Sequence, residues 1–249
     1  MRYDITEYAI KSDKIKNPLY VALFADIHDY TCDELLADLR DRHPSLICIA
    51  GDIVNGYVRH RHYRHASYED TIGFLHECSL IAPTFLSIGN HERVTPLEQL
   101  HDIEKSDITV LDDGFVELPQ GIVIGGLSAA ARSYQSPEYL WLSKFQKVDG
   151  YKILLSHRPE YFALQEPRLS DRPIDLVLAG HAHGGQIRIG DQGMYAPGQG
   201  FFPRYTAGIH KGDFGQIIIS RGLSNTTWIP RINNRPEIVY INIIPQKIA

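Results

Sequence analysis

The feature of this sequence that most limits its fold is a series of short apolar segments that are hydrophobic at nearly every position. A strand that faces solvent on one side alternates between apolar and polar residues, whereas a strand buried on both faces does not. The segments are rich in Val, Ile and Leu, and they are Leu19 to Ala25, Leu46 to Ala50, Thr84 to Ile88, Ile108 to Leu111, Gly121 to Leu127, Tyr151 to Leu155 and Asp175 to Ala179. They predict strands of a sheet that is covered on both faces.

Segments typical of helices lie between several of these strands. They are Asp33 to Arg42, Tyr68 to Leu80, Pro96 to Lys105 and Pro137 to Lys147. Proline suits the first position of a helix, so Pro96 and Pro137 predict helix starts, with Thr95 and Ser136 as the N-cap residues. Strands that alternate with helices indicate the α/β class.

The last third of the chain has a different character. Glycine, proline and aromatic residues cluster from Gly184 to Gly208, and two further apolar segments, Gln216 to Ser220 and Ile238 to Ile244, are typical of strands. This pattern indicates loops and strands with little helix. Since no linker, repeat or low-complexity tract interrupts the sequence, we expect residues 1–249 to form one domain.

Side chains that bind metals follow five of the predicted strands. They are Asp26 and His28, Asp52, Asn90 and His91, His157, and His181 and His183. In open α/β sheets, ligands bind beyond the carboxyl ends of the strands, so these side chains are expected at one edge of the fold. Carboxylate, amide and imidazole groups without thiolates favour Mn²⁺, Fe or Zn²⁺ over a cysteine-rich structural zinc site.

The spacing within two of these motifs adds a further constraint. Residues i and i+2 of an extended segment point to the same side, so Asp26 and His28 are expected to share one metal. His181 and His183 are expected on one side as well, where they would reach neighbouring ions. The glycines beside Asp52, Asn90, His181 and His183 allow sharp turns and the close approach of other groups.

Each motif also has a purely structural explanation when it is taken alone. A Gly-Asp pair usually forms a turn, and a single histidine after an apolar segment is more often a hydrogen-bonded structural residue than a ligand. The combination favours metal binding, because five separate strand ends carry ligand-type residues in order.

Five elements of this sequence resemble the motif series of the calcineurin-like metallophosphoesterase superfamily. They are Asp26-x-His28, Gly51-Asp52, Gly89-Asn90-His91-Glu92, His157 and Gly180-His181-x-His183. The resemblance spans Leu19 to Gln186. Three further segments resemble one bacterial branch of this superfamily, whose members are often membrane-associated phosphohydrolases. They are Gly184-Gly185-Gln186, Arg221-Gly222-Leu223 and Arg235-Pro236-Glu237-Ile238. The resemblance implies a four-layer α-β-β-α sandwich with two mixed β-sheets.

The resemblance also implies roles for individual residues. The first metal would be held by Asp26, His28 and His183, and the second by Asn90, His157 and His181. Asp52 would bridge both ions, and His91 would contact the phosphate or protonate the leaving oxygen. Asn55 departs from the family pattern, because many relatives carry aspartate there; it bears on hydrogen bonding around the ligands.

These roles imply a hydrolase of phosphomonoesters, phosphodiesters or pyrophosphates that uses two ions of Mn²⁺, Fe²⁺, Fe³⁺ or Zn²⁺. Two metals about 3.5–4 Å apart would convert a shared water to a bridging hydroxide. The alternative from another class is a catalytically silent phosphoesterase-like scaffold that binds partner proteins, which predicts substituted ligands that this sequence does not have. An amidohydrolase would leave the Gly-Asn-His-Glu element unexplained.

The composition argues against several other classes. The formal net charge of −5 provides no positive field for non-specific nucleic-acid binding. Three scattered cysteines are too few for a disulfide framework or a thiolate zinc site. Met1 to Asn17 lacks the apolar core of a signal peptide, and no apolar stretch approaches the roughly 18–20 residues of a membrane span, so a cytoplasmic location is expected.

Two further segments bear on the substrate. Tyr57 to His65 follows the second ligand motif, and its Arg59, Arg61 and Arg64 would gather an anionic substrate, either a phosphorylated small molecule or a lipid-linked compound. The alternative is a solvated surface loop.

The aromatic segment Gly198 to Tyr205, with Trp228 and Ile229, would either contact a lipid tail or membrane surface or pack beneath the glycine-rich loop. We favour packing for this segment.

Overall fold

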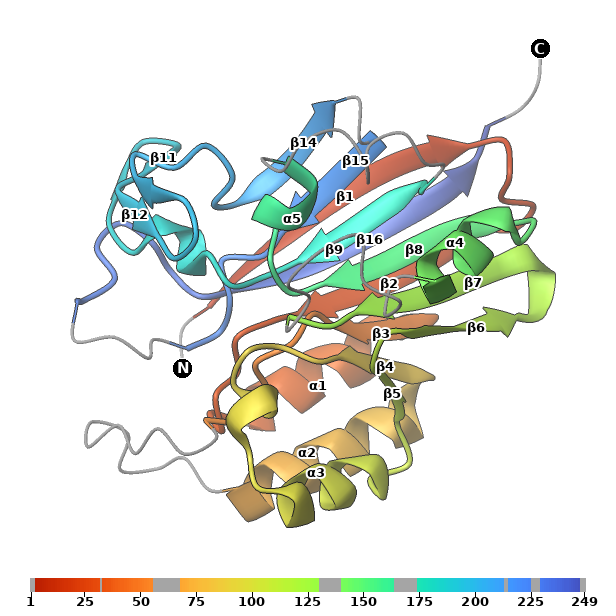
Figure 1. The fold of residues 1–249 in the computed structure, drawn as a ribbon, viewed down its shortest axis with the longest axis horizontal. Helices are drawn as coiled ribbons and strands as arrows, with labels where there is room; N and C mark the ends of the chain where they lie inside the picture. Colours follow the sequence, from red (N-terminus) through yellow and green to blue (C-terminus); the bar gives the residue numbers. More distant parts are fainter. Residues whose placement is uncertain are drawn as a thin grey trace.

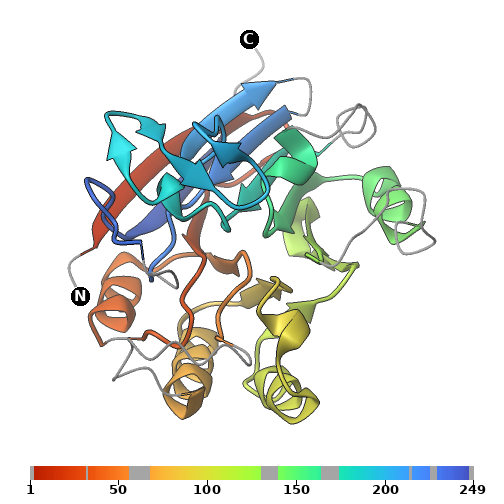
Figure 2. The ribbon, with the colours of Figure 1, turned by 60° about the vertical axis from the view of Figure 1, so that its left-hand side comes forward.

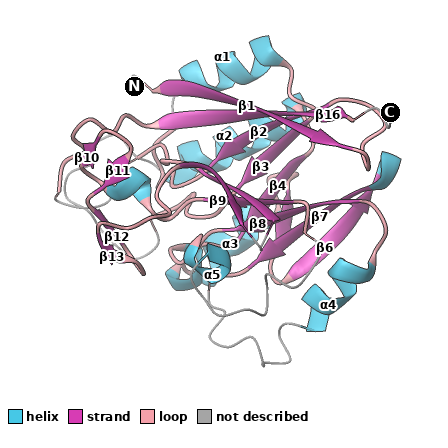
Figure 3. Ribbon diagram, turned by 90° about the horizontal axis from the view of Figure 1, so that it is seen from above, coloured by secondary structure: helices cyan, strands magenta, loops and turns pink. Residues whose placement is uncertain are grey.

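The computed structural model describes residues 3–31, 33–55, 68–129, 140–163, 174–212, 215–224 and 229–246. Two six-stranded mixed sheets pack face to face, and helices cover their outer faces (Figures 1 and 3). The expected four-layer α-β-β-α sandwich is therefore confirmed. Among the helices of the described segments, none has the length and apolar character needed to cross a membrane.

The first sheet combines strands from both ends of the chain. Its spatial order is β1 (Asp4–Ser12), β16 (Glu237–Pro245), β2 (Leu19–Phe24), β3 (Leu46–Ile49), β4 (Thr84–Ser87) and β5 (Thr109–Leu111). Strands β2 to β5 run parallel, β16 is antiparallel to β2, and β1 is parallel to β16. Its outer face is covered by α1 (Asp33–Arg42), α2 (Tyr68–Ile81) and α3 (Leu97–Glu104).

The second sheet has a parallel centre and antiparallel edges. Its order is β14 (Gly208–Gly212), β15 (Gly215–Ile219), β9 (Leu176–Ala179), β8 (Tyr151–Ser156), β7 (Ile122–Leu127) and β6 (Gly114–Leu118). Helix α4 (Leu140–Lys147) packs on its outer face, and α5 (Glu160–Ala163) follows β8. Two short hairpins, β10 (Arg188–Ile189) with β11 (Gln192–Gly193) and β12 (Tyr195–Ala196) with β13 (Gly200–Phe201), lie together at one end of the sandwich (Figures 1 to 3).

The core explains why the strands are apolar at nearly every position. In β2, Val21 and Leu23 face the second sheet, while Ala22 and Phe24 face the helices, and all four side chains are fully buried. Each central strand therefore contributes to two separate apolar layers, which matches the pattern of a strand buried on both faces.

Several sequence-based expectations need correction. Strand β1 was not predicted, because its exposed residues alternate with residues that are mostly only partly buried, at the edge of the sheet. The N-cap of α3 is Pro96 and not Thr95; the Thr95 hydroxyl instead donates to the backbone carbonyl of His91. Ser136 and Pro137 lie outside the described residues.

Candidate metal centre

The candidate site forms where the carboxyl ends of the central strands of both sheets meet. The first sheet supplies Asp26 and His28 after β2, Asp52 after β3, and Asn90 and His91 after β4; the second supplies His157 after β8 and His181 and His183 after β9. Hydrogen bonds connect the two edges, since the His181 backbone N–H donates to Asp26 Oδ2 over 3.0 Å and His157 Nδ1 lies 2.8 Å from the Ala50 carbonyl oxygen. The structure thus brings together all the ligand-type residues singled out from the sequence.

The backbone at these positions is left-handed, not extended. The φ angles are +52° at Asp26, +50° at His28, +53° at Asp52, +65° at His181 and +45° at His183. The extended backbone expected for these motifs is therefore wrong, although Asp26 and His28 do lie in one cluster and His181 and His183 in two neighbouring ones. Non-glycine residues in this region cost about 1–3 kcal/mol each and persist where the surrounding structure fixes them, which is typical of functional sites.

The glycines of the motifs allow close packing around the site, as expected. Gly51 has a φ of +79°, and a Cβ atom on Gly89 would overlap Oδ1 of Asp52. A Cβ atom on Gly180 would lie 2.5 Å from Cβ of Ala25. Side chains at these positions would therefore displace the strand-end loops from one another.

The first cluster consists of Asp26, His28 and His183, all buried. Asp26 Oδ1 lies 3.7 Å from Nε2 of His183 and 4.0 Å from Nε2 of His28. Burial lowers the pKa of both imidazoles, well below the ordinary value for His28, although nearby carboxylates oppose this effect. Neutral imidazoles are the form that binds a metal ion.

The second cluster consists of Asp52, His157 and His181, with Asn90 beside it. Nε2 of His157 lies 3.1 Å from Asp52 Oδ2, 3.2 Å from Asn90 Oδ1 and 3.1 Å from Nδ1 of His181. Asp52 also lies 3.9 Å from Nε2 of His28, so its carboxylate stands between the two clusters.

His91 occupies a more open position than the other histidines. Its Nδ1 lies 3.0 Å from the Asn55 carbonyl oxygen, and its backbone N–H donates to Asp52 Oδ1 over 2.9 Å. Its Nε2 is 3.9 Å from Asp52 Oδ2. A backbone carbonyl, and not the Asp52 carboxylate, is therefore the group that contacts Nδ1 of this ring. The Asn55 side chain donates to the His28 carbonyl, which ties it to the first cluster.

Glu92 supports the loops of the site, although no role was assigned to it from the sequence. It is fully buried, and its carboxylate accepts the backbone N–H groups of Gly89, Asp52, Ile53 and Val54 at 2.7–3.2 Å. Burial, and then the negative charge of Asp52, raise the pKa of Glu92 to about 7. Glu92 thus holds the loop that carries Asp52 against the loop that carries Asn90.

Two arginine side chains beside the clusters were also not identified as site residues from the sequence. Arg231 Nη2 lies 3.3 Å from Nδ1 of His183, and Arg158 contributes, after burial and His157, to lowering the pKa of His181. Arg158 directly follows the motif residue His157, which was a signal for it in the sequence, whereas only the fold brings Arg231 to the site. They provide positive charge near both clusters.

The donor set fits metal ions. Ligands placed about 2.0–2.2 Å from one ion lie about 3–4 Å from each other, which is the range of the distances above. Neither ring nitrogen of His28 has a hydrogen-bond partner among the described residues, although both are buried. A buried polar atom without a partner is costly, and a bound cation would satisfy one of these nitrogens.

The structure tests only part of what was expected of the two segments that bear on substrate binding. Arg59, Arg61 and Arg64, with the rest of Tyr57 to His65, lie outside the described residues, as does Trp228. Tyr205 is buried, whereas Phe201 and Phe202 are 78% and 66% exposed. The favoured packing of the aromatic segment is therefore wrong for these two phenylalanines, because the β12–β13 hairpin carries them away from the core.

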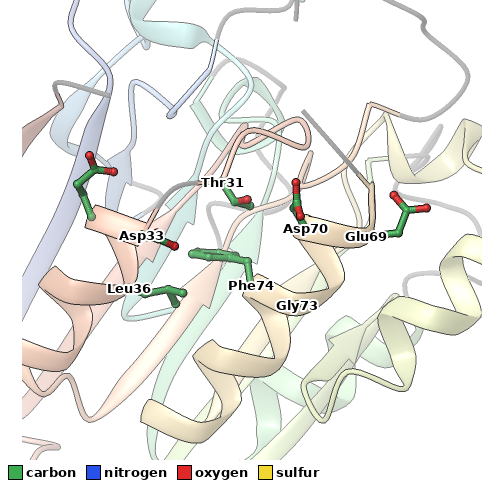
Figure 4. A pocket seen from close by; sticks show the side chains of 8 residues that line it. Thr31, Asp33, Leu36, Glu69, Asp70, Gly73 and Phe74 are labelled. Carbon is green, nitrogen blue, oxygen red and sulfur yellow. The ribbon is translucent and has the colours of Figure 1, made fainter. Parts of the chain in front are cut away.

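A separate cavity of about 590 Å³ lies between α1 and α2, as shown in Figure 4. It is lined by Thr31, Asp33, Glu34, Leu36, Glu69, Asp70, Gly73 and Phe74. Four carboxylates give it a negative character, so it does not suit an anionic phosphoester. It shares no residue with the two clusters.

Comparisons with known proteins agree with this geometry. The sequence model of the family described as calcineurin-like phosphoesterase matches residues 19–185. The chain is 27% identical over 243 residues to Phosphodiesterase YaeI of Escherichia coli (strain K12), covering 91% of this chain and 83% of that protein. It is 26% identical over 254 residues to the uncharacterized metallophosphoesterase YkuE of Bacillus subtilis (strain 168), covering 96% and 85%.

Among solved structures, a dimetal phosphatase from Danio rerio is similar with a TM-score of 0.44 and 14% identity, covering 82% of this chain and 87% of that one. The family match identifies a metal-dependent hydrolase of phosphoesters, and the His/Asp clusters are able to hold metal ions. The chain belongs to the calcineurin-like phosphoesterase family.

Proposed function

We propose that this protein hydrolyses phosphoesters with a pair of metal ions held by the two His/Asp clusters. The observation that carries the proposal is the position of Asp52, whose Oδ2 lies 3.9 Å from His28 of the first cluster and 3.1 Å from His157 of the second. One carboxylate between two ligand sets is the arrangement that a bridging ligand requires.

The ligand assignment follows the clusters. Asp26, His28 and His183 would hold the first ion, Asn90, His157 and His181 the second, and Asp52 both. Oxygen and imidazole ligands suit Mn²⁺, Fe²⁺, Fe³⁺ and Zn²⁺. When bound, two such cations neutralise charge on the phosphoryl group and lower the pKa of a water molecule that attacks phosphorus.

His91 is proposed to protonate the leaving oxygen. The Asn55 carbonyl oxygen accepts from Nδ1, which keeps one proton on that nitrogen and turns Nε2 towards the clusters. A second proton on Nε2 is then available to the departing group, and this transfer is typical of general acid catalysis. His91 is partly exposed, as a group that meets the substrate has to be.

Phosphodiesters are the first substrates to test, because one relative is named a phosphodiesterase. Monoesters and pyrophosphates remain within the proposal. Arg59, Arg61 and Arg64 are proposed to bind an anionic part of the substrate, since guanidinium groups match phosphate geometry. The exposed Phe201 and Phe202 are proposed to contact the apolar part of a lipid-linked substrate or a membrane surface.

The decisive experiment is an activity screen of metal-reconstituted protein against nitrophenyl phosphate, bis-nitrophenyl phosphate and nucleoside diphosphate conjugates, with metal analysis of the same samples. Activity that depends on about two bound ions per chain is the expected result. Asp52→Asn and Asn90→Ala are expected to abolish it, whereas Asn242→Ala, an exposed asparagine on β16, serves as the matched control. A folded protein that binds metal and hydrolyses nothing would favour the scaffold alternative.

A further inference from the structure

Glu160 is a buried carboxylate that the ligand assignment does not use. It begins helix α5, three residues after His157, and it is only 5% exposed. Neither of its carboxylate oxygens has a hydrogen-bond partner among the described residues. Among the described residues, the cation that pairs with it is Arg158, whose Nη1 lies 3.5 Å from Oε1. Burying a carboxylate in this way is unfavourable unless a donor faces it in the working protein.

His181 provides such a donor. Its Nε2 is also buried without a partner in the described part of the chain, and it lies 3.8 Å from Oε1 of Glu160. Its other nitrogen, Nδ1, lies 3.1 Å from Nε2 of His157, inside the second cluster. The two ring nitrogens therefore face different surroundings, one towards the proposed metal ligands and one towards a carboxylate.

The neighbouring His157 has an acceptor for the ring nitrogen that does not face the metal ligands. Its Nδ1 faces the Ala50 carbonyl oxygen at 2.8 Å, so the proton stays on Nδ1 and Nε2 is left for a metal. Histidines that bind metals commonly donate their other N–H to a carboxylate or a carbonyl, which fixes the tautomer and the ring orientation. No backbone carbonyl of the described residues accepts from Nε2 of His181.

We propose that Glu160 is the positioning residue for His181: its carboxylate accepts the Nε2–H and so directs Nδ1 towards the second metal. The inference rests on the proposed function, because it takes His181 to be a ligand. Glu160 itself touches neither the substrate nor the reacting atoms in this scheme.

A glycine in the neighbouring hairpin makes room for the carboxylate. A Cβ atom on Gly198 would overlap Oε1 of Glu160, so any side chain there would push the carboxylate away from its place. Gly198 has a φ of +75°, and Gly200 in the same hairpin has a φ of +78° with no atom within 4 Å of its virtual Cβ. The two glycines therefore differ in what they contact and not in their backbone conformation.

The first experiment measures metal binding directly. Metal-free protein is titrated with Mn²⁺ alone by calorimetry, and the two binding steps are assigned with His28→Ala for the first ion and Asn90→Ala for the second. Glu160→Ala is expected to weaken binding of the second ion about 10- to 100-fold and to leave the first unchanged, as is usual when such a supporting group is removed. Glu160→Gln retains a carbonyl acceptor and is expected to recover part of the affinity.

The second experiment uses the two glycines. Both Gly198→Ala and Gly200→Ala place a side chain on a left-handed backbone, so both are expected to lower the melting temperature to a similar extent. Only Gly198→Ala is expected to weaken binding of the second ion, because only its methyl group displaces Glu160. In Zn²⁺-loaded protein, long-range ¹H–¹⁵N spectra are expected to show the His181 proton on Nε2.

The outcomes separate the inference from the proposed function. Second-site affinity that is unchanged in Glu160→Ala would overturn the inference, and so would equal weakening of both sites with no recovery in Glu160→Gln. Equal second-site affinities in Gly198→Ala and Gly200→Ala, or a His181 proton on Nδ1, would also overturn it. A wild-type protein that binds fewer than two ions would instead contradict the proposed function, and the inference would fall with it.

Discussion

Nε2 of His157 and Oδ2 of Asp52 lie 3.1 Å apart, although the two residues follow strands of different sheets. Burial opposes both charges, yet the pair holds the pKa of Asp52 well below its ordinary range and raises the pKa of His157 to about 9. These opposite shifts favour an ion pair in the absence of metal, with the proton of His157 on the nitrogen that would bind the second ion.

Metal affinity is therefore expected to depend on pH. A protonated imidazole is not a ligand, so an ion at the second cluster has to release the His157 proton at any pH below about 9. The affinity for Mn²⁺ is expected to rise about tenfold per pH unit between roughly pH 6.5 and 8.5. Calorimetry in buffers of different ionisation enthalpy checks this by counting protons released; a pH-independent affinity would contradict it.

The same pair is expected to make the stability of the metal-free protein depend on pH. The folded-state pKa of His157 lies above the ordinary value of 6.5, so its stabilising contribution is complete below about pH 6.5 and is lost as the pH rises through about 9. Urea unfolding of chelator-treated protein across this range measures the effect. The free energy of unfolding of Asp52→Asn is expected to fall less steeply over the same pH range, because its His157 has no charged partner.

His91→Asn is expected to lower kcat without releasing metal. Loss of a general acid reduces the rate by about 10²- to 10⁴-fold, and the loss is smaller when the leaving group departs without a proton. Activity on an alkyl phosphodiester should therefore fall much further than activity on bis-nitrophenyl phosphate, while metal content stays the same. His76→Ala, on the exposed face of α2, is the matched control. Equal losses on both substrates would contradict the role of proton donor.

The positions of the central strands and the ligand-type residues at their ends were accessible from the sequence because both depend on local composition. The four-layer arrangement and the division of the ligands between two ions were implied by the family resemblance alone. A strand such as β2 is apolar on both faces, and the polar residue that follows it stands out against that background. The polar edge strand β1 gives no such contrast, since its solvent-facing side chains alternate with side chains that are mostly only partly buried. Its pairing with β16 joins the two ends of the chain, which local composition does not reveal.

The rest of the site depends on contacts between distant segments. Glu160 meets His181 and the Gly198 turn only because α5 and the β12–β13 hairpin fold onto the same strand ends. Phe201 is likewise exposed because the β12–β13 hairpin points away from the core, which the amino-acid composition of the segment does not reveal. The left-handed backbone at Asp26 could not be foreseen either, because only the crowded strand-end loops make this conformation necessary.

Glu92→Ala is expected to destabilise the protein strongly. Its carboxylate accepts four buried backbone N–H groups, and each donor left without a partner costs about 1–3 kcal/mol. A loss of several kcal/mol in the free energy of unfolding is expected, together with loss of second-site metal binding, because Asp52 is displaced. Glu98→Ala, an exposed glutamate on α3, is the control in urea unfolding. Losses of similar size in the two variants would show that Glu92 is not the anchor of these loops.

Gly89→Ala tests whether close packing behind Asp52 is needed for metal binding. The added methyl group would overlap Oδ1 of Asp52 and lie 2.7 Å from Oε2 of Glu92, so the carboxylate that stands between the clusters has to move. Gly73→Ala in α2 adds the same methyl group where no atom lies within 4 Å, and it is expected to stabilise the helix by about 0.5–1 kcal/mol. Metal content and activity should therefore fall in Gly89→Ala and stay unchanged in Gly73→Ala. Full metal loading of Gly89→Ala would mean that the Asp52 loop adjusts without cost, and that the glycine of this motif serves the turn alone.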